Sequence, residues 1–141
     1  MHDFPLLGPV FALAAWTGLV LLLIPYRRIR SALRREVAAN DFRLGESARV
    51  PAEVSIPNRN YMNLLELPVL FYVVCMIFCL TGAHSPMTLT LAWAFVGLRV
   101  IHSLIHLTSN HILHRLTAFA LSNVVLVFLW INAGLLVFSS N

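Results

Sequence analysis

Polar side chains that could bind or activate a ligand recur at helical spacing inside apolar stretches of this sequence. One set stands at positions i, i+4 and i+7 and comprises Arg59, Asn63 and Glu66. A second set stands at i, i+3, i+7 and i+11 and comprises Arg99, His102, His106 and Asn110. Because residues three or four apart share one face of a helix, each set predicts a polar stripe along a helix.

Both stripes lie inside apolar segments, where ionisable residues are expensive, at roughly 2.5–3.5 kcal/mol each on insertion scales. Glu66 lies about 10 Å along the helix from Arg59, so we expect it to contact Arg99 or His102 across a helix–helix interface. One interpretation is that Glu66 and Arg99 only neutralise each other and set the register of a bundle. This interpretation does not explain the other polar groups, namely Arg59, Asn63, His102, His106 and Arg115. Together the seven groups predict a cavity for a polar, anionic ligand.

A metal site is a weaker interpretation of the same histidines. His102 and His106 stand four residues apart, which suits a pair of ligands on one helix. However, no carboxylate or cysteine stands in that segment, and Arg99 and Arg115 flank it. Positive neighbours oppose the binding of a cation, so we expect no metal.

The composition excludes most classes of water-soluble protein. Of the 141 residues, 59% are hydrophobic and 11% are charged, and the mean hydropathy is +0.79. A soluble domain is about one quarter charged, so the chain is neither an ordinary cytosolic enzyme nor disordered. Cys75 and Cys79 lie four apart in an apolar run, which excludes a disulfide scaffold. The length suits one domain, residues 1–141.

Charge-free runs predict an all-α membrane protein, a bundle of four transmembrane helices. Since about 20 apolar residues cross a bilayer, the expected spans are residues 5–26, 58–80, 86–108 and 113–138. A loop is expected at 27–57. The turn composition around Gly82 separates the second span from the third. Pro57 is expected to precede the second helix, which would start at Asn58, and Pro68 to kink it.

The arginines predict how the chain is oriented in the membrane. All ten basic residues are arginines, and eight of them lie between residues 27 and 59. Without interleaved aromatic residues or a soluble fold, this run argues against nucleic-acid binding. The positive-inside rule places the loop 27–57 and Arg115 on the cytoplasmic side and both termini outside. The arginines after Tyr26 are spaced to continue the first helix beyond the bilayer.

The motifs together resemble the MAPEG superfamily, the membrane-associated proteins in eicosanoid and glutathione metabolism. The resemblance rests on Arg59-x-x-x-Asn63-x-x-Glu66 followed by Pro68, on Arg99-x-x-His102-x-x-x-His106, and on Arg115. It covers nearly the whole chain, and residues 92–106 look like the bacterial branch in particular. The resemblance implies a homotrimer in a bacterial inner membrane with both termini periplasmic. It also implies that glutathione binds between neighbouring subunits near the cytoplasmic face.

The resemblance further implies roles for individual residues. Asn63 and Glu66 would hold the glutathione backbone, and Arg59 would brace this motif or reach the carboxylates of glutathione. Arg99 and His102 would support or contact the ligand. The expected catalytic residues are Arg115, which would stabilise the glutathione thiolate, and His106, which would hydrogen-bond the thiolate or lie as a cation beside it. A cation beside a thiol favours the thiolate and so activates the nucleophile.

The sequence departs from the family pattern close to these residues. His106 stands where eukaryotic members often have a tyrosine, and Phe119 stands where some have another. Tyr61 and Met62 replace a basic pair of one branch, and Leu116 stands where prostaglandin E synthase has a serine. A eukaryotic eicosanoid substrate is therefore not expected.

Three functions remain open at this point. The first is a glutathione transferase or peroxidase, in which a small lipophilic substrate enters from the lipid bilayer and the soluble thiol enters from the cytoplasmic mouth. The second is a non-catalytic membrane protein that binds glutathione, another anionic ligand or a lipid headgroup. The third is a structural bundle whose polar residues only lock the homotrimer. The variant Arg115→Ala separates the first two, and Asn63→Ala separates the third.

Overall fold

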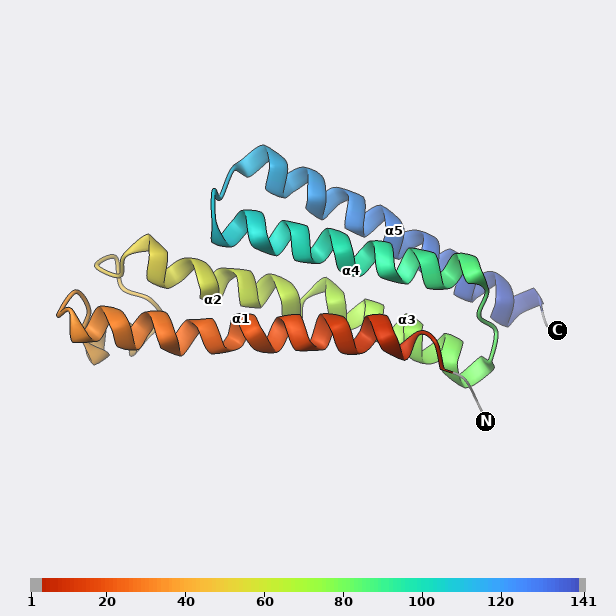
Figure 1. Ribbon diagram of the computed structural model, residues 1–141, viewed down its shortest axis with the longest axis horizontal. Helices are drawn as coiled ribbons and strands as arrows, with labels where there is room; N and C mark the ends of the chain where they lie inside the picture. The colour runs from red at the N-terminus through yellow and green to blue at the C-terminus, as the bar shows by residue number, and fades with distance from the viewer. Residues whose placement is uncertain (1–3, 140–141) are drawn as a thin grey trace.

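The described part of the protein, residues 4–139 of the computed structural model, is built from helices that run side by side as four rods (Figure 1). The helices are α1 (Leu7–Leu33), α2 (Ala52–Leu65), α3 (Leu67–Thr81), α4 (Pro86–Leu107) and α5 (Ile112–Ser139), with a 3-10 turn, η1 (Ala39–Phe42), in the first loop. Helices α2 and α3 follow each other within one rod. The expected all-α class is confirmed.

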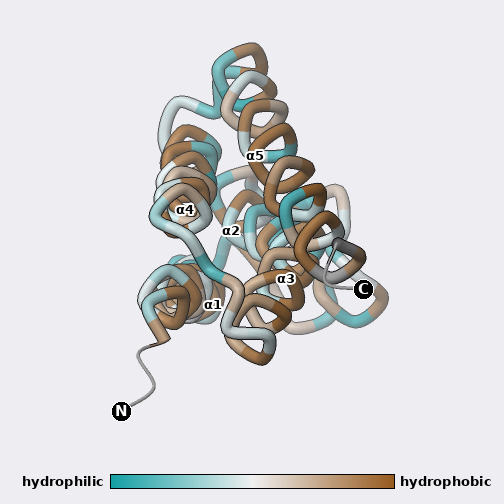
Figure 2. The backbone as a smooth tube through the Cα atoms, turned by 90° about the vertical axis from the view of Figure 1, so that its right-hand side faces the viewer, coloured by the Kyte–Doolittle hydropathy of each residue, from teal (hydrophilic) through white to brown (hydrophobic). Residues whose placement is uncertain are grey.

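Each of the four rods in the described residues is long and apolar enough to cross a membrane. The candidate spans are Leu7–Leu33, Ala52–Thr81, Pro86–Leu107 and Ile112–Leu136. Large apolar side chains also cover the outside, since Leu22 is 66% exposed and Val127 is 57% exposed. Figure 2 shows hydrophobic residues along much of α3 and α5. An apolar exterior of this kind suits lipid rather than water, so the chain is an integral membrane protein with a four-helix bundle.

The second rod is broken at Glu66, which has φ −82° and ψ −94° and separates α2 from α3. Pro68 lies in the first turn of α3. It lacks an N–H, and its ring would collide with the carbonyl of Leu64, four residues earlier. The carbonyl of Glu66 instead accepts a hydrogen bond from the N–H of Val69 at 3.2 Å. The expected kink at Pro68 is thus confirmed as a break in the helix.

Helix α2 begins six residues earlier than expected. Its first residue is Ala52, and Pro57 lies buried inside the helix. The expected start at Asn58 is wrong because a proline in the second turn removes only one hydrogen bond close to the helix start. Helix α1 continues to Leu33, beyond Tyr26, as the spacing of the arginines predicts. The loop expected at 27–57 is therefore reduced to residues 34–51.

The connections gather at two ends of the bundle (Figure 1). Residues 34–51 and the turn 108–111 lie towards one end. The turn 82–85 lies at the other end, together with the start of α1 and the end of α5. Gly82 terminates α3 in the left-handed conformation with φ 67°, and Ser85 Oγ caps α4 by accepting from the N–H of Thr88 at 3.2 Å.

The half of the bundle that contains α3 holds an apolar core. The rings of Phe71 and Phe95 stack with centroids 4.6 Å apart and planes at 18°. Both side chains are fully buried, as are Leu13 on α1 and Leu129 on α5. Aromatic and aliphatic packing therefore joins α1, α3, α4 and α5 here, although Tyr72 packs against this core and Thr88 is buried on α4.

Candidate functional site

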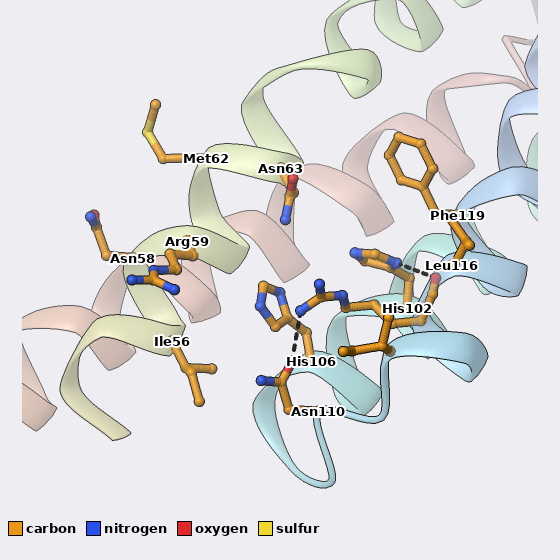
Figure 3. A pocket seen from close by; sticks show the side chains of 12 residues that line it. Ile56, Asn58, Arg59, Met62, Asn63, His102, His106, Asn110, Leu116 and Phe119 are labelled. Carbon is orange, nitrogen blue, oxygen red and sulfur yellow. Dashed lines mark hydrogen bonds between the residues drawn. The ribbon is translucent and has the colours of Figure 1, made fainter. Parts of the chain in front are cut away.

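A cavity of about 530 Å³ lies between α2, α4 and the start of α5 (Figure 3). It is lined by Ile56, Asn58, Arg59, Met62, Asn63, His102, His106, Asn110, Ile112, Arg115, Leu116 and Phe119. Five of the seven expected site residues are among them, namely Arg59, Asn63, His102, His106 and Arg115. The two polar stripes therefore face one another, and the first turn of α5 adds a third wall.

Asn60 and Ser103 connect the two helices that carry the stripes. Asn60 Nδ2 donates to Ser103 Oγ at 2.6 Å, and both side chains are fully buried. Each is the next residue after a cavity residue, Arg59 on α2 and His102 on α4. A buried, directional bond at this point fixes how the two stripes lie relative to each other.

Arg115 lies in the first turn of α5, and its guanidinium is held beside the cavity. Its Nη1 donates to Asn110 Oδ1 at 2.7 Å (Figure 3). The N-terminus of a helix carries a partial positive charge. The guanidinium adds a full charge at the same place, so an anion in this part of the cavity is stabilised by both.

His102 and His106 line the wall that α4 contributes. His102 Nδ1 lies 3.0 Å from the carbonyl oxygen of Arg115, which assigns the proton to Nδ1 as the donor. The two imidazole rings are 6.0 Å apart, and both residues are buried. His102 Nε2 and His106 Nδ1 have no hydrogen-bond partner within the described residues. These two nitrogens are buried in the wall of the cavity, where an unbonded polar atom carries a desolvation cost.

Arg99 and Glu66 lie outside the cavity. Arg99 is fully buried, and its Nη2 donates to Asn123 Oδ1 at 3.0 Å. Its guanidinium also lies 5.0 Å from the centre of the Phe119 ring, which lines the cavity. Arg99 therefore contacts the wall of the cavity from behind.

The expected contact of Glu66 with Arg99 or His102 is wrong. No ion pair joins Glu66 to either residue within 4–139. The break at Glu66 ends α2, and the side chain is left exposed. Its charge still acts on Arg99 at longer range. Helical spacing placed the carboxylate at the right depth but did not anticipate the change of direction that the break imposes.

The wall of the cavity is cationic and rich in amides. Arg59 and Arg115 supply the charge, and Asn58, Asn63 and Asn110 supply amides. None of the described residues that line it is acidic. Among the described residues no three His, Cys, Asp or Glu side chains converge as a metal site would require. The arrangement therefore favours a ligand with negative charge and several hydrogen-bonding groups.

A second cavity of about 340 Å³ continues the first towards the loop end of the bundle. The two cavities share Ile56, Arg59 and Asn110. The second is otherwise lined by residues from the segment 46–55. The second cavity therefore lies next to the first, on the side of residues 46–50.

Some residues of the site were not identified from the sequence. Ile56 was assigned to the expected loop and Asn58 to the first position of the expected helix, and a start at Ala52 brings both into the body of the helix. With that start, the i, i+4 spacing of Asn58 and Met62 indicates the cavity face. Asn60 and Ser103 give no such signal, because they become partners only once the packing of α2 on α4 is known.

Comparison with known families matches residues 6–135 to the MAPEG family. Comparison with curated proteins and with solved structures finds no match. The matched range includes the first three rods, the fourth as far as residue 135, and every residue that lines the cavity. Members of this family typically use glutathione, and the family suggests a membrane-bound, glutathione-related transferase or peroxidase function. From its sequence motifs, its four-helix membrane fold and this match, the chain belongs to the MAPEG family.

Proposed function

We propose that the protein is an integral membrane glutathione transferase or peroxidase that acts on lipophilic electrophiles. The sulfur of bound glutathione attacks as the thiolate. With an aryl halide a C–S bond forms as halide leaves. With an alkyl hydroperoxide the thiolate attacks the terminal oxygen, an S–O bond forms as the O–O bond breaks, and the alcohol leaves after taking up a proton. A second glutathione then attacks the resulting sulfenic acid, so that the disulfide forms and water leaves. The observation that carries the proposal is the Arg115 guanidinium, held beside a cavity with no acidic residue among its described lining residues.

Glutathione fits the cavity in size and charge. The cavity volume of about 530 Å³ lies in the range of roughly 300–1,000 Å³ common for small-molecule sites. Glutathione carries two carboxylates, one ammonium and two amide groups besides its thiol. Arg59 is suited to one carboxylate, and Asn63 and His102 are suited to its amide groups, because guanidinium–carboxylate and amide–amide pairs match donors with acceptors.

Arg115 and His106 are the proposed catalytic residues. A guanidinium in the first turn of α5 places a fixed positive charge and the helix N-terminus at one point, and both lower the free energy of a thiolate relative to its thiol. The His106 side chain, which lines the cavity, is proposed to hydrogen-bond the sulfur. Together they stabilise the thiolate and so activate the nucleophile.

Arg99 and Glu66 receive less direct roles. Arg99 supports the ligand through Phe119, against which its guanidinium packs. Glu66 is exposed at a depth where an uncovered carboxylate is costly. We infer that a neighbouring copy covers it in a homotrimer, where the carboxylate accepts from the ammonium of glutathione at the boundary between subunits.

The proposed location is a bacterial inner membrane, with the loop end cytoplasmic and both termini periplasmic. The positive-inside rule supports this orientation, since most arginines stand at the loop end. Glutathione then enters through the second cavity from the cytoplasm. The lipophilic substrate enters from the bilayer along Met62, Leu116 and Phe119, the apolar part of the lining.

The proposal is tested by the ultraviolet difference spectrum of detergent-purified protein on addition of glutathione. We expect a saturable thiolate band for the unaltered protein. In Arg115→Ala the band disappears, while much of the binding, measured by equilibrium dialysis, remains. The matched control is Arg43→Ala, which removes an exposed arginine of the first loop and leaves the band unchanged.

Turnover of an aryl halide and of an alkyl hydroperoxide then separates transferase from peroxidase activity. A thiolate band without turnover of either probe assigns the protein to ligand binding rather than catalysis. Absence of both band and binding in the unaltered protein overturns the glutathione proposal.

A further inference from the structure

We propose that Asn110 is a positioning residue for Arg115, whose guanidinium it holds towards the cavity so that the guanidinium meets the reacting sulfur. The inference rests on the proposed function, because it concerns the thiolate that Arg115 stabilises. Asn110 belongs to the short turn between α4 and α5 and lines both cavities. Its backbone and its side chain each contribute to the argument.

The backbone of Asn110 is in the left-handed region, with φ 48°. This region is uncommon for residues other than glycine, and asparagine tolerates it better than most. The N–H of Asn110 donates to the carbonyl of Ile105 at 2.7 Å, which reverses the chain at the end of α4. Asparagine therefore combines two properties at this position: it adopts the conformation the turn needs, and it presents a side-chain acceptor.

The side chain of Asn110 holds the guanidinium of Arg115 at a position that is electrostatically unfavourable for a cation. Arg115 stands in the first turn of α5, where the helix dipole repels positive charge. Arg59 lines the same cavity, so a second positive charge lies on the cavity side of Arg115. These forces would turn the guanidinium towards water. The hydrogen bond from Arg115 Nη1 to Asn110 Oδ1, 2.7 Å long, opposes them.

The acceptor is a neutral amide, and this matters for the chemistry. A carboxylate would hold the guanidinium as well, but it would cancel the positive charge that the thiolate requires. An amide oxygen orients Arg115 without cancelling its charge, and it occupies one nitrogen of the guanidinium. Asn110 thus acts on the thiolate only through Arg115.

The test is Asn110→Gly, which keeps the left-handed conformation accessible and removes the side-chain amide together with its acceptor oxygen. We expect the acid dissociation constant of the bound thiol to fall about tenfold, on the scale of one hydrogen bond to a charged group, so that at the midpoint of the unaltered protein the thiolate fraction falls about fivefold. The readout is the pH titration of the thiolate band. Ser109→Gly is the matched control, since it adds a glycine at an exposed neighbour in the same turn, and it should titrate like the unaltered protein.

A double-mutant cycle with Arg115→Ala separates positioning from a general effect on the turn. Asn110→Gly should raise the dissociation constant for glutathione by a larger factor in the unaltered protein than in Arg115→Ala, where only the direct contribution of this lining amide is lost. An equal factor in both backgrounds overturns the inference, because Asn110 would then act independently of Arg115. An unchanged titration in Asn110→Gly also overturns it, while the proposed function stands. If the unaltered protein gives no thiolate band, the proposed function fails first and this inference fails with it.

Discussion

The two halves of the bundle are held together in different ways. In the half that contains the cavity, α2 and α4 are joined by the hydrogen bond between Asn60 and Ser103, and α4 and α5 by the bond between Arg99 and Asn123. In the half that contains α3, buried aromatic and aliphatic side chains join the helices, as in the stack of Phe71 on Phe95. The break at Glu66 marks the boundary within the second rod.

The difference follows from what each kind of contact can do. Apolar packing is strong in sum but weakly directional, so it stabilises the bundle and tolerates small shifts. Hydrogen bonds between buried side chains are fewer, and each fixes the relative position of two helices. A site built from three helices needs that precision, whereas the opposite half only needs to keep the rods together.

The largest effect on stability is expected from the apolar half. Phe71→Ala removes a fully buried ring, and loss of such a side chain costs about 3–5 kcal/mol of the free energy of unfolding. Reversible unfolding in mixed detergent micelles measures this cost. The fraction that remains folded should bind glutathione with unchanged affinity, because Phe71 does not line the cavity.

Val73→Ala is the matched control for Phe71→Ala. Val73 lies on the same helix but is 43% exposed, and we expect a change of less than about 0.5 kcal/mol in the free energy of unfolding. A folded Phe71→Ala protein with weakened glutathione binding would show that the two halves are coupled, contrary to the comparison.

An intermediate effect is expected from the bond that joins the stripes. Asn60→Ala leaves the buried hydroxyl of Ser103 without a partner, which costs about 1–3 kcal/mol of the free energy of unfolding. Glutathione affinity should fall as well, because α2 is then free to shift relative to α4. Unfolding and glutathione binding are measured on the same preparations.

Replacing both partners sharpens the distinction. In Asn60→Leu/Ser103→Ala no polar group is left unsatisfied, so much of the stability should return. Glutathione affinity should stay low, because an apolar contact does not restore the directional bond. Recovery of affinity together with stability would mean that packing alone sets the geometry of the site.

Much of the fold was predictable because the membrane imposes simple rules. Charge-free runs of sufficient length have to be helices, and a proline such as Pro68 favours a kink in one of them. The start of α2 was not predictable in the same way. Pro57 is compatible both with a helix start and with the second turn of a helix that begins at Ala52, and only packing of that turn decides between them.

The site was predictable as far as helical periodicity extends. Arg59 and Asn63 on α2 and His102 and His106 on α4 share faces at fixed spacings, and they line one cavity. The partner of Arg99 was not predictable, because it depends on how the helices pack after the break at Glu66. Asn123 Oδ1 accepts the hydrogen bond from Arg99, whereas the sequence pattern pointed to the carboxylate of Glu66.

The smallest expected effect concerns the loop at the polar end, away from both cores. Asp41 accepts hydrogen bonds from the backbone N–H of Ala38 at 2.8 Å and from Ser47 Oγ at 2.7 Å. These two bonds hold the pKa of Asp41 below its ordinary value of 3.8, and the bond from Ala38 contributes the most. Because the folded pKa is the lower one, the contribution of Asp41 to loop stability is fully present above pH 3.8. It is lost as pH falls through the folded value.

Acidification should therefore open the loop without disturbing the apolar half. Amide hydrogen exchange in residues 38–47, corrected for the intrinsic pH dependence of exchange, should accelerate as pH falls from about 5 to about 2. In Asp41→Asn this acceleration should vanish, since the side chain no longer titrates. Exchange within α3 should stay slow in both proteins over the same range. Equal acceleration in α3 and in the loop would mean that acid acts on the bundle as a whole, and that the polar end has no separate local stability.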